Sequence, residues 1–132
     1  MIQQRELTKE ELEKLLIEAP LSETKFLRDN NIANFEFFKS GVACQGLVIN
    51  DNPVYIAMIR QGIFWTVVNK DVKEKITLCK YAKKQLLKWV YIFGKLTATM
   101  HKDNKENMKW VEWLGFKKIY EDTNIVTYMI GA

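Results

Sequence analysis

The stretch Asn104-Lys-Glu-Asn-Met-Lys-Trp-Val-Glu-Trp-Leu-Gly-Phe116 decides how the rest of the chain can be arranged. Lys105, Lys109 and Glu112 fall on one narrow strip of a helical wheel. The rest of the circumference is covered by apolar residues, namely Met108, Trp110, Val111, Trp113 and Leu114. The pattern predicts a short, largely buried helix. Asn104 suits its N-cap, and Gly115 stands where a left-handed residue would end it, with Phe116 as the apolar contact beyond.

On either side of this helix the sequence favours strands. Lys95–His101 precedes it, after a turn at Gly94. Phe116–Glu121 and Ile125–Ile130 follow it, and the short polar stretch between these two predicts a hairpin. The predicted order of elements in the C-terminal part is therefore strand, helix, strand, strand.

Further toward the N-terminus, 72–90 reads as a long helix. We expect its lysines to lie away from an apolar stripe. That predicted stripe consists of Val72, Ile76, Cys79, Ala82, Leu86, Leu87 and Val90. The helix would pack this stripe against a sheet.

The middle of the chain has the pattern of an antiparallel meander. Three runs rich in β-formers, 42–49, 54–59 and 63–68, are separated by polar turns that contain Asn, Asp, Pro or Gly. The runs are apolar on both sides, so we expect helices over at least one face of the sheet.

The N-terminal part predicts a short strand and two helices. Ile2–Leu7 alternates weakly, and Thr8-Lys-Glu-Glu11 is a capping box for a helix that ends before Pro20. Ser22 is a candidate cap for a second helix. The segment 32–38 fits either a helix or an extended chain. The predicted order is therefore β-α-α-β-β-β-α-β-α-β-β, an α+β fold of the α/β/α kind.

Length and composition favour one domain, spanning residues 1–132 of a chain of 132 residues. No apolar run approaches the roughly 20 residues that cross a bilayer, and the first residues do not form a signal peptide, so we expect a soluble, intracellular protein without a membrane partner. Cys44 and Cys79 lack metal-ligand spacing, and we interpret them as reduced core thiols rather than a disulfide or a catalytic thiol.

The net charge of +4 is modest, but lysines gather between Lys70 and Lys88. Such a helix attracts polyanions, including nucleic acid or the phosphates of coenzyme A, or it is simply a solvated face. Asp71 and Glu74 interrupt the basic surface at one end. Nucleic acid is therefore the weaker interpretation.

The C-terminal pattern resembles that of the Gcn5-related N-acetyltransferase (GNAT) superfamily, which is roughly Asn-x-x-Ala-x-x-Leu-Tyr-x-x-Leu-Gly-Phe. The residues that match are Asn104, Trp110, Leu114, Gly115 and Phe116. The predicted order of elements also resembles the GNAT topology along the whole chain. The resemblance implies a mixed central sheet of about six to seven strands with about four helices.

The resemblance also implies acetyl-CoA as cofactor, held in a V between the fourth and fifth strands, and an amine as acetyl acceptor. On this chain the implied cofactor-binding residues are Val67, Val68, Lys73, Lys75, Ile76, Thr77 and Asn104. Asn104 can instead be an N-cap alone. His101, at the end of the fifth strand, is the candidate catalytic base. Tyr120 and Tyr128 are candidates for a proton donor.

Two departures from the GNAT pattern bear on activity. Val111 occupies the place of the general-acid Tyr, and the pyrophosphate loop, which would fall on 73–78, has no glycine to let a phosphate approach the backbone. The glycine-free loop, the lysine-rich helix and the pattern Asn104-x-x-x-x-Lys109-Trp110 with Gly115 beyond it are similar to small GNAT-like proteins of short-tailed bacteriophages, some of which are internal virion proteins. The chain is therefore an N-acetyltransferase, or an inactive GNAT-fold protein that contacts a phage or host protein. It would lie in the host cytoplasm or in the virion.

Overall fold

The structure is a computed structural model that describes residues 1–69 and 73–131. The strands are β1 (Ile2–Arg5), β2 (Ala43–Ile49), β3 (Asn52–Arg60), β4 (Ile63–Val68), β5 (Leu96–His101), β6 (Lys117–Glu121) and β7 (Ile125–Ile130). The helices are α1 (Lys9–Glu18), α2 (Leu21–Asp29), α3 (Phe35–Lys39), α4 (Lys75–Phe93) and α5 (Lys105–Leu114).

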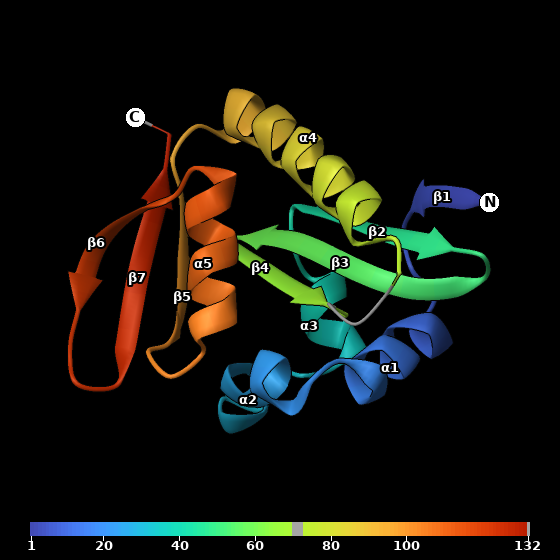
Figure 1. The fold of residues 1–132 in the computed structure, drawn as a ribbon, viewed down its shortest axis with the longest axis horizontal. Helices are drawn as coiled ribbons and strands as arrows, with labels where there is room; N and C mark the ends of the chain where they lie inside the picture. Colours follow the sequence, from blue (N-terminus) through green and yellow to red (C-terminus); the bar gives the residue numbers. More distant parts are fainter. Residues whose placement is uncertain (70–72, 132) are drawn as a thin grey trace.

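All strands join one seven-stranded sheet in the order β1-β2-β3-β4-β5-β7-β6. Every neighbouring pair is antiparallel except β4 and β5, which run parallel. A parallel pair needs a crossover connection, and α4 provides it. The sheet therefore divides into an N-terminal meander and a C-terminal three-stranded part that meet at β4 and β5 (Figure 1).

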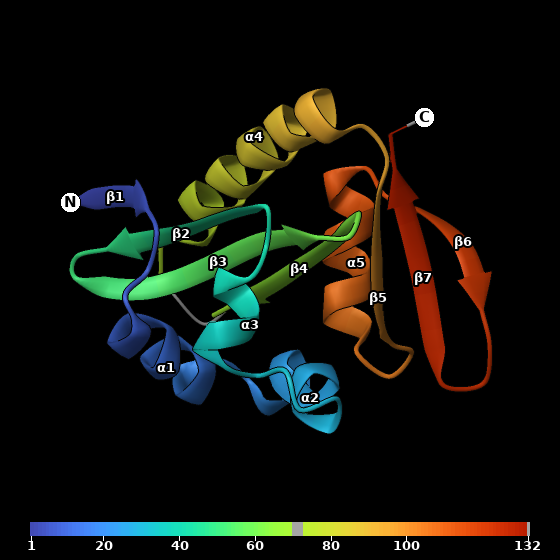
Figure 2. The same ribbon diagram turned by 180° about the vertical axis from the view of Figure 1, so that it is seen from behind.

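Helices cover both faces of the sheet. α4 and α5 lie on one face, and α1, α2 and α3 lie on the other, as the two opposite views show (Figures 1 and 2). A separate apolar cluster fills each interface, one containing Leu86 and Val111, the other containing Leu15 and Phe38. This arrangement explains why the strands are apolar on both sides, as their sequence predicts.

The predicted order of elements and the fold class are confirmed, with one helix added. The segment 32–38, which the sequence left open, forms most of α3 (Phe35–Lys39), capped by Asn34. The capping box of α1 forms as predicted, with Thr8 and Glu11 bonded to each other's backbone N–H. The predicted cap of α2 is wrong, because the helix begins two residues earlier and Pro20 takes the N-cap position instead of Ser22. Proline is suited to a helix start because its φ is already helical.

α5 begins and ends as its sequence predicts. The Asn104 side chain accepts a hydrogen bond from the Asn107 backbone, and Gly115 is left-handed with φ 110°. The Phe116 N–H bonds to the Val111 carbonyl, which closes the C-terminal turn. The prediction that the helix is largely buried is wrong: Val111 and Leu114 are buried, whereas Trp113 is 50% exposed. The helix covers one face of the sheet, so only one stripe of it can be buried.

The start and the buried stripe of α4 also differ from the prediction. The helix runs from Lys75 to Phe93, whereas the prediction was 72–90, and the first predicted residue, Val72, lies outside the described residues. The buried residues of α4 are Leu78, Ala82, Gln85, Leu86 and Trp89. Ile76 and Leu87 are 76% and 54% exposed. Apolar residues surround this helix on several sides, so their spacing alone could not decide which side meets the sheet.

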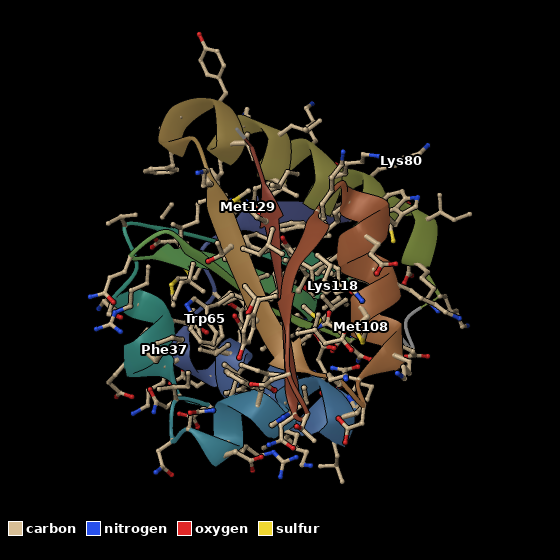
Figure 3. All side chains as sticks on the ribbon, turned by 90° about the vertical axis from the view of Figure 1, so that its left-hand side faces the viewer. Phe37, Trp65, Lys80, Met108, Lys118 and Met129 are labelled. Atoms are coloured by element: carbon tan, nitrogen blue, oxygen red, sulfur yellow. The ribbon has the colours of Figure 1, made fainter. Side chains whose placement is uncertain are left out.

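α4 is the longest of the described helices, at 19 residues, and it carries several lysines on its outer side. Lys80 is one of them and points away from the sheet (Figure 3). In the described ranges, no helix has the length and apolar character needed to cross a membrane.

Candidate functional site

The junction of β4 and β5 opens into a V. The two strands share one register pair, Ile63 with Thr97, beside a hydrogen bond from the Thr97 N–H to the Gly62 carbonyl of 3.0 Å. Beyond this point they diverge (Figure 1). Backbone groups on the facing sides of diverging strands must find partners outside the sheet. The V is therefore the place in the sheet where side chains or a ligand can reach the strand backbone.

A cavity of about 40 Å³ lies in the V, between α2, β4, β5 and α5. Its polar lining includes Glu23 from α2, His101 from β5, and Asn104 and Asn107 from the start of α5. Phe26 and Trp65 are among its apolar residues. Segments far apart in the sequence thus contribute to one small polar chamber.

Glu23 is the functional candidate that the sequence did not reveal. It is 7% exposed, and its Oε1 accepts a hydrogen bond of 3.2 Å from the backbone N–H of Val68 in β4. Glutamate is almost never buried unless it is paired. In the sequence, Glu23 is an ordinary acidic residue in the first turn of a helix. Only the packing of α2 against β4 makes it a buried carboxylate in the V.

Several polar contacts hold α2 across the V. The Asn104 amide donates a hydrogen bond of 3.2 Å from Nδ2 to the Ser22 carbonyl. On the next turn of α2, Lys25 lies 3.9 Å from Asp103. α2 therefore contacts β4 through Glu23 and the start of α5 through these two pairs.

His101 and Asn104, predicted from the sequence, both line the cavity. His101 Nε2 lies 3.3 Å from Asp29 Oδ2, and the Phe26 ring meets the imidazole edge-on, with 5.2 Å between the centroids. Asn104 is 8% exposed, and both of its polar side-chain atoms are hydrogen-bonded. Its Oδ1 accepts from the Asn107 N–H in α5, and its Nδ2 donates to the Ser22 carbonyl in α2. The capping role expected for Asn104 is thus present, together with a second, structural one.

A second hollow, of about 320 Å³, lies between the start of α4, the end of β4 and α5. It is lined by Val68, Leu78, Cys79 and Trp110, with Lys75, Lys109 and Glu106 as charged residues. We call it the α4–α5 groove. It lies on the α4 side of the sheet, whereas the small cavity reaches α2 on the other side.

The other predicted cofactor-binding residues are spread around the α4–α5 groove. Lys73 is exposed and precedes α4, and Thr77 is half-buried in its first turn. Ile76 points into solvent and does not line the groove. Val67 belongs to the cluster on the α1 face, so its side chain points away from the groove that Val68 lines.

The position of the general-acid Tyr in the GNAT pattern is apolar and buried. Val111 lines the small cavity and is 2% exposed. The Tyr128 hydroxyl instead donates a hydrogen bond of 2.7 Å to Glu112, and burial together with this bond raises the pKa of Tyr128. The Tyr120 hydroxyl donates to Asp122 on the surface. Neither tyrosine lines the cavity.

The chain has the fold of GNAT acetyltransferases. No protein-family model and no curated protein matches the sequence. Among solved structures, a GNAT-family acetyltransferase from Bacillus anthracis is 13% identical with a TM-score of 0.67, covering 98% of this chain and 94% of that one. The PaiA N-acetyltransferase of Thermoplasma acidophilum, in complex with coenzyme A, is 16% identical with a TM-score of 0.66, covering 100% and 99%.

A third structure is similar along its whole length. The N-acetyltransferase PseH of Campylobacter jejuni, in complex with acetyl coenzyme A, is 13% identical with a TM-score of 0.60, covering 99% of both chains. At these identities the similarity concerns the fold. The chemistry has to be argued from the residues of this chain.

Proposed function

We propose that this chain is an acetyl-CoA-dependent N-acetyltransferase that acts on an amine. The observation that carries the proposal is the Glu23 carboxylate, buried in the V and hydrogen-bonded to the backbone of β4. A buried carboxylate in a cleft is a candidate for proton transfer. Glu23 is connected to the α4–α5 groove through Val68, because its carboxylate accepts a hydrogen bond from the N–H of Val68, which lines that groove.

The α4–α5 groove fits the cofactor. Its apolar walls, such as Leu78 and Trp110, suit a pantetheine arm, and Lys75 and Lys109 suit phosphates. Among the described residues no side chain caps the first turn of α4, and the N–H groups of a helix start suit an anion. Ile76 in the glycine-free loop is turned to solvent, so its side chain does not cover the start of α4.

Acetyl-CoA, when bound, supplies an acetyl thioester. Glu23 is the residue that would take the proton from the amine nitrogen, since it is a buried acceptor within the V. The Asn104 bond to Ser22 holds α2, and with it Glu23, against the V. Val111 offers no proton, so this chain has no general acid at that position. His101, tied to Asp29, is the second candidate base.

Two observations on the V favour a second function. Val111 replaces the acid, and α2 closes the V to a cavity of about 40 Å³. A GNAT-fold protein that has lost catalysis and binds a phage or host protein, in the virion or in the host cytoplasm, would show both features. In that case the V is a structural junction and acetyl-CoA does not bind.

Thermal unfolding with and without acetyl-CoA separates the two functions, with desulfo-CoA as a control for thioester chemistry. A ligand at 100 times its dissociation constant stabilises the folded state by about 2.7 kcal/mol, which raises the Tm by several degrees in a domain of this size. Release of free thiol in the presence of mixed primary amines then measures transfer. An unchanged Tm at millimolar acetyl-CoA would refute the proposal and favour the second function.

A matched pair of variants tests the groove itself. Lys75→Glu places a negative charge in the α4–α5 groove, and Lys80→Glu makes the same change on the exposed outer side of the same helix (Figure 3). We expect Lys75→Glu to abolish most of the Tm shift and Lys80→Glu to keep it. If both variants lose the Tm shift equally, the lysines act only through the overall positive charge of the helix, which would contradict a cofactor site in this groove.

A further inference from the structure

In the described part of the chain, the start of β2 has no neighbouring strand on its outer edge. β1 ends at Arg5, which pairs with Gly46, and Glu6 and Leu7 then lead away to α1. β1 lies only beside the end of β2 that leads into β3 (Figure 2). Residues 43–45 of β2 therefore form an open edge of the sheet, about 10 Å long at the usual rise of a strand.

The backbone of Cys44 faces this open edge. In an antiparallel ladder, alternate residues direct both the N–H and the C=O to the same neighbour. The Asn50 N–H donates a hydrogen bond of 2.8 Å to the Met1 carbonyl, so every second residue counted back from Asn50 faces the side of β1. At Cys44, β1 has already ended, and no other described backbone group bonds to Cys44 across this edge. The half-buried Cys44 therefore offers an N–H and a C=O that a further strand could bond.

A cavity of about 510 Å³ lies along this edge. Phe35 and Phe38 of α3 line it, and so does Trp89 of α4. These helices cover opposite faces of the sheet, so the edge of β2 lies at the bottom of a slot between them. We call this cavity the β2 edge slot. Its volume is in the range of roughly 300–1,000 Å³ that is typical of ligand pockets.

The walls of the β2 edge slot are apolar on both sides. Side chains of a strand point alternately to the two faces of its sheet. A strand laid beside β2 would therefore place its side chains in turn against Phe35 and against Trp89. A strand that is buried on both faces is typically a continuous apolar run. The charged lining residues Glu6 and Lys39 are exposed and opposite in sign, so the slot favours a neutral occupant over a polyanion.

The flanking helices also decide which kind of strand can enter. Residues of α3 and α4 line the cavity beside the edge of β2, so both helices reach past that edge. The β2 edge of a second copy carries the same two helices, which would collide with the first pair. A single extended chain brings no such helices. The slot therefore suits a short free segment rather than the edge of another sheet.

We infer that the β2 edge slot binds an extended, uncharged segment of about three apolar residues from a partner protein, which joins the sheet as a strand beside β2. The backbone of this segment bonds to the Cys44 N–H and C=O, and its side chains contact the two apolar walls. Among the described residues, the slot shares no lining residue with the cavity in the V or with the α4–α5 groove. The inference therefore goes beyond the proposed function and does not depend on it.

The test uses a capped pentapeptide of serine, isoleucine, valine, isoleucine and serine, added to the full chain labelled with ¹⁵N. We expect a saturable NMR shift of the Cys44 backbone amide, and hydrogen exchange of this amide slowed by at least about tenfold. The same peptide, methylated on its central backbone nitrogens, keeps the side chains but cannot pair as a strand. It should bind at least about tenfold more weakly. No saturable shift at millimolar peptide, or equal binding of the methylated peptide, would overturn the inference.

A matched pair of variants locates the bound peptide. Phe35→Ala removes part of one wall of the slot, whereas Phe93→Ala makes the same change at the end of α4, outside the slot. We expect Phe35→Ala to weaken peptide binding about fivefold or more and Phe93→Ala to leave it unchanged. Equal binding in both variants would overturn the assignment to this slot. If Phe35→Ala fails to fold, the methylated peptide decides the question with the unchanged chain.

Two further measurements separate other occupants and the proposed function. Protection of the Cys44 amide that rises with protein concentration, without peptide, would make a second copy the occupant and overturn the partner segment. Sedimentation velocity at the same concentrations would then show a dimer, whereas we expect a monomer. Acetyl transfer is measured separately by thiol release. Loss of transfer with intact peptide binding would refute the acetyltransferase and retain the strand site, and the reverse result would refute only the strand site.

Discussion

Replacing Glu23 with glutamine tests the catalytic assignment with little change in structure. The glutamine Oε1 can still accept the hydrogen bond of 3.2 Å from the Val68 N–H. What disappears is the negative charge and the capacity to take a proton. Glu23→Ala, in contrast, leaves that buried N–H of β4 without its side-chain acceptor. Comparing the two variants therefore separates chemistry from folding.

The expected magnitudes follow from these contacts. A hydrogen bond to a charged group contributes about 1.5–3 kcal/mol and one to a neutral group about 0.5–1.5 kcal/mol, so Glu23→Gln should lower the free energy of unfolding by roughly 1 kcal/mol. Glu23→Ala should cost about 1–3 kcal/mol for the unsatisfied N–H. A positioned general base contributes about 10²–10⁴-fold, so both variants should lose that factor in kcat/KM, or about 3–5 kcal/mol of barrier.

Urea unfolding followed by circular dichroism gives the stabilities, and thiol release with n-butylamine gives kcat/KM. His101→Gln is the control, because His101 lines the same cavity and is the rival base. We expect its kcat/KM to fall far less than that of Glu23→Gln. Full turnover in Glu23→Gln would refute the assignment of the base to Glu23. If kcat/KM falls by about 10²–10⁴-fold in His101→Gln and not in Glu23→Gln, His101 is the base.

Three further predictions concern the folded state. The bidentate contact with the Arg5 guanidinium holds the pKa of Glu11 down at about 2. The stability that this contact contributes is therefore present above the ordinary pKa of 4.5 and is lost as the pH falls toward 2. Its contribution should not exceed about 1 kcal/mol, because the pair is partly exposed. In urea unfolding at several pH values, the free energy of unfolding should therefore fall less on acidification in Arg5→Leu than in the unchanged chain. In Gly46→Ala the added methyl group would collide with the Leu7 side chain, so the free energy of unfolding should fall by about 1–3 kcal/mol in the same urea assay, and an unchanged midpoint would contradict this packing. Burial raises the pKa of the Cys44 thiol to about 11, so iodoacetamide should label Cys44 slowly at neutral pH in the folded protein and fast in urea, as mass spectrometry can measure.

The sequence predicted α5 closely because its ends are local structures. The Asn104 cap and the left-handed Gly115 each require a particular residue within one turn of the chain, so the pattern can be recognised without knowledge of the rest. The strands of the meander were predicted for a related reason. Their runs of β-formers end at turns whose residues are equally local.

Burial of single residues on the helices was predicted less well. Ile76 and Leu87 were expected in the stripe of α4, yet both are exposed. Trp113 was expected to be buried on α5 and is half exposed. A helix with apolar residues on several sides can bury any of them, and the choice depends on which side the sheet occupies.

The sequence by itself determined the order of elements, the α+β fold class and the two positions, His101 and Asn104, that line the V. The tertiary structure decided what the V contains. It buries Glu23 against Val68, leaves Asn107 Oδ1 without a donor from the described part of the chain and places Val111 in the same cavity. Glu23, Val68 and Asn107 come from α2, β4 and α5, and nothing in their local sequence indicates that they meet. Local propensity fixes elements, whereas the chemistry of a cleft depends on desolvation and on partners that only packing brings together.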